Sequence, residues 1–317
     1  MKFLAFLLLP ALLLAETNDT PIWDPWLTDP FFTPTATNID PGHLLVQPVF
    51  AALWQYGSYT NNWGIKREDT IWSINPGIVL QTGFSEKTGI EGFFGFTTNF
   101  QSGKQSTHFD DILLFLGYQL LEDDRNSWVP DLRLQLQVNV PTGKYKNFDP
   151  DKTDIESTGN GAYQLGPVLA YQKLYAHTHS YFVLHWSLGY IFPFKANVKG
   201  FNTYGGGYGT DGTIRPSQTF YAFLSGEYAY AKHWVFAWDS FIFYNTATSS
   251  FSGTPGVQAN GKPAETGLDY SININLSPQI EYNFSETSGL LFGVWATVAG
   301  RNTDALLGLL FTYVHIF

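Results

Sequence analysis

The clearest candidate for chemistry in the chain is a histidine and a serine separated by one residue, His185 and Ser187. In an extended strand, side chains two residues apart share a face and lie about 7 Å apart along it. An imidazole can take the proton of a serine hydroxyl when a third group orients the ring, as in lipolytic enzymes. The sequence assigns no orienting Asn or Asp to this pair, and simple packing of two polar side chains is the alternative. We therefore predict no catalytic residue and no enzyme, with a lipolytic enzyme as the remote alternative.

Four carboxylates crowd a second hydrophilic segment, at Asp149, Asp151, Asp154 and Glu156. Calcium binds oxygen ligands of this kind, but the spacing lacks the glycine and the terminal glutamate of an EF-hand loop. A solvated acidic loop is the more common meaning of such a run. The chain also contains no cysteine, which excludes disulfide and thiolate chemistry. We predict no metal centre and no cofactor, and these four residues are the weak metal candidates.

A third set of polar residues repeats with a period of two. From Asp131 to Val140 every odd-numbered residue is polar and every even-numbered residue is apolar. An extended chain with this pattern has two chemically opposite faces. Similar alternation occurs in 218–231, 234–245 and 270–283. The polar faces of these segments contain Arg133, Gln135, Gln137, Asn139, Glu227, Asp239, Asn273, Asn275, Gln279 and Glu281.

The segments that carry these faces are long for strands and suit a tilted strand that crosses a bilayer. Short connections at 85–88, 122–130, 175–178, 231–232 and 285–287 alternate with mostly long ones at 58–69, 102–106, 143–160, 193–217 and 247–267; the final one, at 300–303, is short. Outer-membrane barrels alternate short periplasmic turns with longer outside loops in this way. We predict strands at about 44–57, 70–83, 89–101, 107–121, 131–142, 161–174, 179–192, 218–231, 233–246, 268–283, 288–298 and 304–317.

The composition indicates a partly non-aqueous surface. Aromatic residues make up 17% of the chain and charged residues only 14%, compared with roughly a quarter in soluble domains. After the first fifteen residues no apolar stretch approaches the length of a spanning helix, which excludes a helical bundle. Charge facing lipid costs about 2–4 kcal/mol for a mid-membrane Arg or Lys, so the polar faces are predicted to line a lumen. The predicted fold is all-β, a transmembrane antiparallel up-and-down barrel of about twelve strands with both termini periplasmic.

The two ends of the chain add targeting signals. Residues 1–15 carry a lysine and then an apolar run that ends at Ala15, which is typical of a secretory signal peptide cleaved near that residue. Residues 16–43 are rich in proline, which disfavours a central strand, and form either a periplasmic arm or a partial plug of the barrel at 44–317. The last strand places Phe311, Tyr313 and Phe317 in phase. This pattern resembles the signal read by the outer-membrane assembly machinery, although His315 interrupts its apolar register.

The middle of the chain resembles a known family. Asp111 precedes an apolar strand, a second strand closes in Pro141-Thr142-Gly143, and a glycine-rich strand follows with Gly166-Pro167. This arrangement is similar to that of the outer-membrane proteins grouped as the meta-pathway phenol-degradation family. The resemblance covers about a third of the chain and implies a barrel for uptake of hydrophobic solutes.

Together these features predict an outer-membrane channel that passes small solutes, hydrophobic or aromatic ones among them, through a polar lumen. The alternative is a closed barrel that acts as a surface-binding or structural protein through its long outside loops. The predicted partners are outer-membrane lipid, the assembly machinery and a small-molecule solute. Nucleic acid is not among them, because the net charge is -10 and phosphate binding needs positive charge. The sequence specifies neither the solute nor the oligomeric state.

Overall fold

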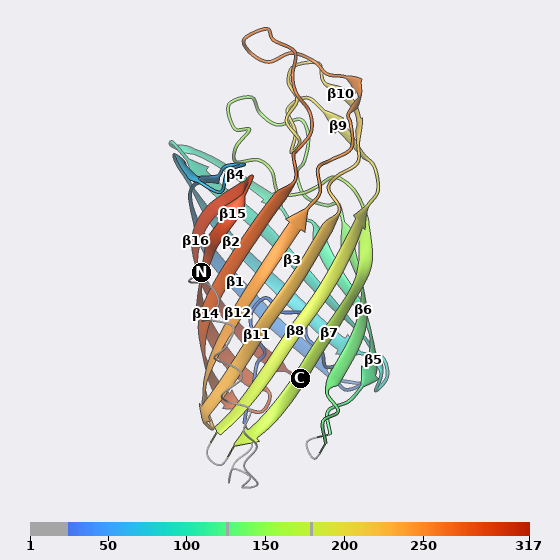
Figure 1. Cartoon of the computed structure of the whole chain (residues 1–317), viewed down its shortest axis with the longest axis vertical. Helices are drawn as coiled ribbons and strands as arrows, with labels where there is room; N and C mark the ends of the chain where they lie inside the picture. The colour runs from blue at the N-terminus through green and yellow to red at the C-terminus, as the bar shows by residue number, and fades with distance from the viewer. Residues whose placement is uncertain (1–24, 125–126, 178–179) are drawn as a thin grey trace.

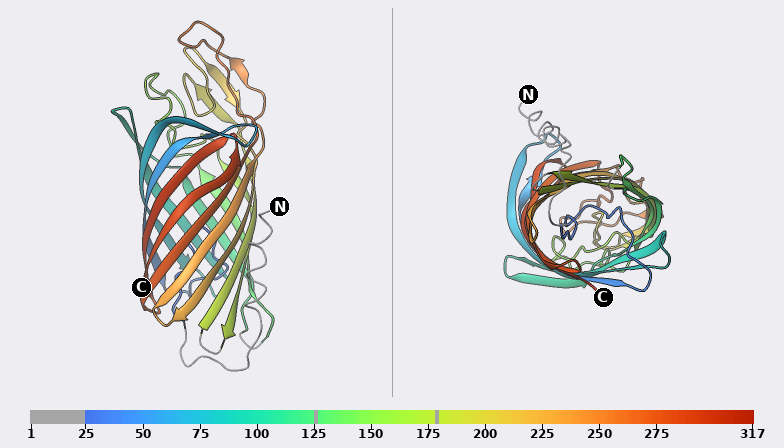
Figure 2. Two further views of the ribbon diagram at one scale, coloured as in Figure 1. Left: turned by 60° about the vertical axis from the view of Figure 1, so that its left-hand side comes forward. Right: turned by 90° about the horizontal axis from the view of Figure 1, so that it is seen from below.

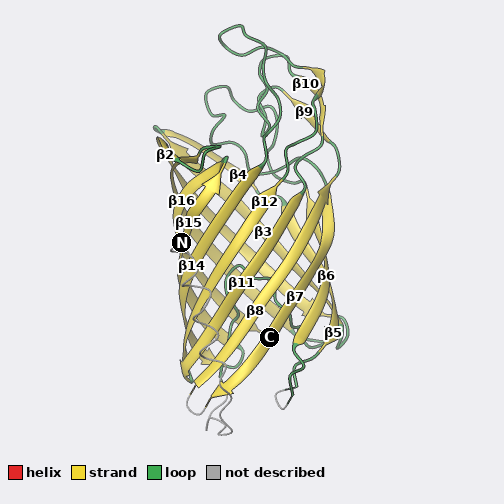
Figure 3. Ribbon diagram, viewed as in Figure 1, coloured by secondary structure: helices red, strands yellow, loops and turns green. Residues whose placement is uncertain are grey.

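A computed structural model describes residues 25–124, 127–177 and 180–317 (Figure 1). The predicted signal peptide at 1–15 lies outside these residues. The described residues form sixteen strands joined by turns and loops (Figure 3). No helix in this part of the chain is long and apolar enough to cross a membrane.

Thirteen of these strands close into one antiparallel barrel, in which each strand pairs with the barrel strands before and after it in the chain, apart from β4 and β5. The first and last barrel strands also pair, at Phe50 with Phe311 for example, and this pairing closes the cylinder. β4 (Lys104–Phe109) and β5 (Ile112–Leu121) both pair with β3, at different parts of its length. They therefore share one position in the wall, and the barrel has twelve strand positions. The other positions are held by β1 (Leu44–Tyr59), β2 (Ile65–Gly83), β3 (Thr88–Gln101), β6 (Asp131–Val140), β7 (Gln164–His177), β8 (Ser180–Pro193), β11 (Thr219–Ala231), β12 (Trp234–Asn245), β14 (Ser271–Ser285), β15 (Ser288–Arg301) and β16 (Thr303–Ile316).

Two predicted loops and one predicted strand need correction. β2 begins at Ile65, so the loop predicted at 58–69 is a short turn, and the loop predicted at 102–106 is reduced to Ser102 and Gly103, both with positive φ. The polar run 66–69 suggested a loop. Its residues are exposed, so strand pairing continues beyond the apolar band of the barrel into water without burying charge. The strand predicted at 107–121 is interrupted at Asp110 and Asp111.

The three long connections, 141–163, 194–218 and 246–270, lie together at one end of the barrel, here called the long-loop end (Figures 1 and 2). They contain a second, three-stranded sheet that the sequence did not suggest, formed by β9 (Ala196–Lys199), β10 (Asp211–Ile214) and β13 (Ser252–Thr254). A small core of buried residues supports it: Ala162, Ala196, Val198, Tyr204 and Ile214. The opposite end carries the tight connections and is called the short-turn end.

The alternation along β6 separates the two faces of the wall. Leu134 and Leu136 are exposed on the outer face, with Leu136 41% exposed, whereas Gln135 and Gln137 are buried, with Gln137 7% exposed. Successive side chains of a strand point to opposite faces, so the register of pairing carries this division around the barrel. The outer face of the barrel is therefore apolar, and the inner face is polar.

Three of the residues that carry the family resemblance, Asp111, Thr142 and Gly143, meet at the interruption between β4 and β5. Asp111 accepts a hydrogen bond from the amide of Gly143 (2.9 Å) and another from the amide of Asn160 (2.8 Å). The Thr142 hydroxyl donates to the carbonyl of Asp110 (2.7 Å). A Cβ on Gly166 would lie only 1.8 Å from the carbonyl oxygen of Tyr190, so the close approach of β7 to β8 requires glycine there. The motif therefore anchors the 141–163 loop to the wall.

Replacing Asp111 with asparagine should loosen this loop. The amide side chain can accept one of the two hydrogen bonds but points an N–H at the other donor, and losing a charged hydrogen bond costs about 1.5–3 kcal/mol. We expect faster hydrogen exchange at the amides of Gly143 and Asn160. Asp110→Asn is the matched control, because that carboxylate accepts from the Thr97 hydroxyl instead (2.8 Å). Equal exchange in both variants would contradict the anchoring role.

Candidate functional site in the barrel lumen

The first described residues, 25–43, run inside the cylinder. Figure 2 (right) shows this blue segment within the ring of strands, seen from below. The segment joins the wall at its end, where Pro41 bridges to Gly83 and the amide of Leu44 donates to the carbonyl of Phe317 (3.3 Å). It is called the inner segment below, and the side chains that contact it are the candidate functional site.

One side of the inner segment is held by β14. The amide and hydroxyl of Thr28 both donate to Oε2 of Glu281, at 3.3 and 2.9 Å. The amide of Phe31 donates to Oε1 of Gln279 at 3.1 Å. An extended segment without a strand partner leaves its N–H groups unpaired, and these side chains supply the missing acceptors.

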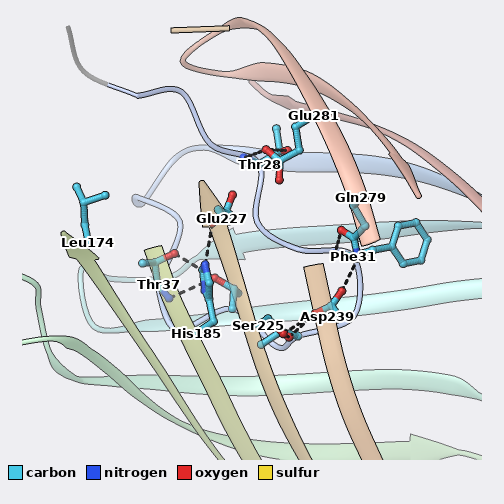
Figure 4. Close-up of polar contacts among 12 residues, drawn as sticks. Thr28, Phe31, Thr37, Leu174, His185, Ser225, Glu227, Asp239, Gln279 and Glu281 are labelled. Carbon is cyan, nitrogen blue, oxygen red and sulfur yellow. Dashed lines mark hydrogen bonds and ion pairs between the residues drawn. The ribbon is translucent and has the colours of Figure 1, made fainter. Parts of the chain in front are cut away.

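Asp239 of β12 binds the next part of the inner segment (Figure 4). Its Oδ2 accepts from the amide of Phe32 (3.1 Å), and its Oδ1 accepts from the hydroxyls of Thr33 (2.6 Å) and Ser225 (2.7 Å). The Thr33 and Ser225 hydroxyls also contact each other. Gln279 donates to Oδ2 of the same carboxylate at 2.6 Å. A fully buried carboxylate with this many donors is well satisfied, which makes Asp239 the firmest attachment point of the inner segment.

The opposite wall holds the inner segment through β6. The fully buried Arg133 donates from a guanidinium nitrogen to the carbonyl of Thr37 (2.8 Å), and Gln135 donates to the carbonyl of Thr35 (3.0 Å). Lumenal groups on both sides of the barrel thus bond the same stretch of backbone.

The remaining predicted lumenal residues lie nearer the long-loop end. Gln137 accepts from the Tyr221 hydroxyl (2.7 Å) and donates to Asn139 (2.9 Å). Asn275 accepts from the Trp295 indole at 3.0 Å, and Asn273 donates to the Thr303 hydroxyl at 2.9 Å. These four predicted residues form side-chain contacts with the wall rather than with the inner segment.

The histidine of the predicted pair has a different partner. Nε2 of His185 lies 2.7 Å from Oε2 of Glu227, and both side chains are buried. The Ser187 hydroxyl is buried and has no hydrogen-bond partner in the structure. The carboxylate therefore engages the imidazole from the neighbouring strand, and the geometry gives no support to proton transfer between His185 and Ser187.

An aromatic layer lies in the lumen between the carboxylates and the long-loop end. Phe223 stacks on Phe241 with ring centroids 5.0 Å apart, and Phe32 of the inner segment packs on Phe241 at 4.9 Å. Sequence reasoning missed this layer because it assigned aromatic side chains to the lipid face. The signal was present, since Phe223 has the same odd-number parity as Glu227, and Phe241 the same as Asp239. The layer comprises Phe115, Tyr221, Phe223 and Phe241, with Phe32, Phe243 and Trp295 packed against it.

A cavity lies at each end of the barrel. The cavity at the long-loop end has a volume of about 400 Å³ and is bordered by Tyr204, Asn245 and Asp269. The Tyr204 hydroxyl donates to the carbonyl of Asn160 (2.5 Å), and burial, reinforced by the charge of Asp111, raises the pKa of Tyr204, so the phenol stays neutral. The cavity at the short-turn end measures about 420 Å³ and is bordered by Thr37 and Asp131 among others.

The other predicted residues lie away from the lumen. In the acidic loop the amide of Asp149 donates to Glu156 (2.7 Å) and the amide of Asp151 donates to Asp149 (3.0 Å), so these carboxylates serve the loop backbone. Asp154 is exposed. Phe311 of β16 is exposed, and so is Phe317, which comes directly after the strand. Tyr313 stacks on His315 with ring centroids 6.2 Å apart. Metal binding by the loop and an assembly role for the aromatic residues stay predictions.

Comparisons with known proteins agree with this architecture. A family model described as "Putative MetA-pathway of phenol degradation" matches residues 91–313. No curated protein matches the chain in sequence. An outer membrane channel from Pseudomonas putida F1 superposes with a TM-score of 0.67 at 14% identity, over 92% of this chain and all of the other. The Pseudomonas putida toluene transporter TodX matches at a TM-score of 0.38 and 10% identity, over 87% of this chain and 91% of its own. At 14% identity, the likeness to the channel from Pseudomonas putida F1 is one of fold.

Proposed function

The chain belongs to the family described as "Putative MetA-pathway of phenol degradation", and we propose that it is an outer-membrane channel for small solutes, hydrophobic and aromatic ones among them. The solute would pass between the two end cavities through the lumen. A closed cylinder with an apolar outer face and a polar inner face suits a lipid bilayer, because every backbone hydrogen bond is made within the wall. The outer membrane channel from Pseudomonas putida has the same fold.

The proposed orientation places the long-loop end outside the cell and the short-turn end in the periplasm. Bacterial barrels carry their longer loops outside. The inner segment enters from the short-turn end, next to the start of β1 and the end of β16, so both termini of the described chain would be periplasmic. A solute would then meet the long-loop cavity first, the aromatic layer second and the inner segment last.

The observation that carries the proposal is the order of these layers. A polar cavity of about 400 Å³ lies at the long-loop end, the aromatic layer lies further along the barrel, and the carboxylates that bind the inner segment lie beyond that layer. Aromatic surfaces bind planar apolar molecules through stacking and burial. The inner segment occupies the lumen below, so we propose that it acts as a plug at residues 25–43 and must move for a solute to pass.

The closed-barrel alternative has two observations in its favour. The inner segment is hydrogen-bonded to both walls of the lumen, through Asp239 on one side and Arg133 on the other. The long-loop end also carries a folded three-stranded sheet that could contact another molecule. A barrel that served only as a scaffold for these loops would never need to release the inner segment, and this difference separates the two functions experimentally.

The aromatic layer should decide how the channel interacts with aromatic solutes. We expect phenol, used as the probe, to interrupt the ion current of single barrels in planar bilayers, and Phe223→Ala to weaken this block several-fold, since a stacked aromatic pair contributes about 0.5–1.5 kcal/mol. Phe236→Ala is the matched control, because Phe236 is 46% exposed on the outer face. If both variants were blocked like the wild type, the aromatic layer would not be the solute path.

A further inference from the structure

A cluster of metal-ligand side chains lies where the inner segment meets the wall. Asp29 of the inner segment, His185 of β8 and Glu227 of β11 each place a ligand atom within 4.8 Å of the others. Among the described residues, this is the one group of three or more potential ligands gathered so closely. The three come from sequence positions far apart and meet only because the barrel closes around the inner segment.

Two oxygens at this place are buried and unpaired. Oε1 of Glu227 and Oε1 of Glu281 have no hydrogen-bond partner, and both side chains are fully buried. The two carboxyl groups interact with each other directly. A buried carboxylate oxygen without a donor carries a large desolvation cost, which either a proton shared between the two carboxyl groups or a bound cation would remove.

The local charge is also unbalanced. Asp29 and Glu227 lie around a single imidazole, Glu281 interacts with Glu227, and Asp239 lies on the adjacent strand. Of the ion pairs in the described part of the chain, only the pair between His185 and Glu227 includes any of these carboxylates. Buried charges are normally paired or bound to a metal, so a cation would remove the imbalance.

We propose that Asp29, His185 and Glu227 form a binding site for one divalent transition-metal ion, with zinc as the best fit and Glu281 as an additional ligand. One imidazole nitrogen with carboxylate oxygens is a usual zinc set, whereas magnesium and calcium prefer oxygen ligands alone. Two ligands at about 2.0–2.2 Å from a tetrahedral zinc lie about 3.3 Å apart. His185 Nε2 and Glu227 Oε2, now 2.7 Å apart, need to separate only slightly to bind it.

The site would fasten the inner segment to the wall. Asp29 is the ligand supplied by the inner segment, and the other ligands are supplied by barrel strands, so a bound ion adds a cross-link beside the hydrogen bonds to Asp239. This role rests on the proposed function, in which the inner segment must move. A metal ion would then favour the plugged state, and its removal would favour release.

Metal binding is tested on the full-length folded barrel in detergent at neutral pH. Equilibrium dialysis against zinc, followed by elemental analysis, should give one ion per barrel. Asp29→Asn and His185→Gln should each weaken binding by more than the 10- to 100-fold typical of losing an outer-shell partner. Asp40→Asn is the control, since Asp40 lies on the same segment, is exposed and is not in the cluster. Each variant is first checked for folding by its shift on unheated gels.

The fastening role has its own readout. Thr33 is buried against the wall, so a Thr33→Cys side chain should react with a maleimide only when the inner segment leaves. Zinc should slow this labelling several-fold, and it should have no effect when Asp29→Asn is added. If the barrel binds zinc but the rate of maleimide labelling is the same with and without zinc, the fastening role is refuted.

Two results would overturn the site itself. One is the absence of stoichiometric zinc in the folded wild-type barrel, which would mean that protons alone neutralise the carboxyl groups. The other is unchanged binding in both Asp29→Asn and His185→Gln. A barrel that binds zinc through these residues but never conducts ions would refute the channel function and leave the metal site standing.

Discussion

Oxidation of the double variant Thr33→Cys/Ser225→Cys should abolish the ion current through the barrel, and reduction should restore it. The hydroxyls of Thr33 and Ser225 are in contact, so two sulfur atoms at these positions would be close enough for a disulfide of about 2.05 Å. The natural chain has no cysteine, so no other disulfide can form. If the inner segment must leave for ions to pass, one covalent bond to β11 closes the channel, and the expected loss of current is nearly complete.

The single variants Thr33→Cys and Ser225→Cys are the controls for this experiment. Each removes one of the hydroxyls that donate to Asp239, so each should have a current somewhat above that of the wild type. Neither should respond to oxidant. Cross-linked barrels, verified on non-reducing gels, that conduct as well as reduced ones would show that the inner segment does not gate the lumen.

Leu136→Arg should cost about 2–4 kcal/mol of barrel stability in a bilayer and sharply lower the yield of assembled protein. Leu136 is exposed on the outer face in the middle of β6, so the guanidinium would face lipid. Unfolding by guanidinium in lipid vesicles measures the free energy, and the shift between heated and unheated gel samples measures assembly.

The neighbouring residue provides the matched test of the register. Gln137→Arg places the same charge on the inner face, where Gln137 contacts the Tyr221 hydroxyl and Asn139. We expect it to assemble and to make the open channel less selective for cations, because a positive side chain in the lumen repels them. Normal assembly of Leu136→Arg with failure of Gln137→Arg would mean that the two faces of β6 are inverted.

Most of the fold could be predicted because polar and apolar residues alternate along each strand with a period of two residues. Along β6 and β14 the alternation of polar and apolar residues gives both the strand and its inward face, and the observed bounds differ from the predicted ones by a few residues. The break at Asp110 and Asp111 could not be predicted, because it depends on the amides of Gly143 and Asn160, which approach only in the folded loop. The sheet of β9, β10 and β13 likewise joins short segments from two separate loops.

The site was predicted as a face but not as a set of contacts. Parity places Glu227 and Asp239 on the inner face, yet the partners His185 and Asp29 depend on the register between strands and on the path of the inner segment. The aromatic layer was missed for a related reason. Aromatic residues occur on both faces of β11 and β12, and the parity that separates the inward Phe223 from an outward residue such as Phe236 was not applied to them.

The conductance of the wild-type barrel tests the central claim most directly. Full-length protein is purified, shown to be folded by its shift between unheated and boiled gel samples, and added to planar lipid bilayers in salt solution. We predict discrete current steps from single barrels, with closures as the inner segment returns to Asp239. A folded barrel that gives no steps and admits no solute into vesicles would contradict the channel and favour a closed barrel that acts through its long loops.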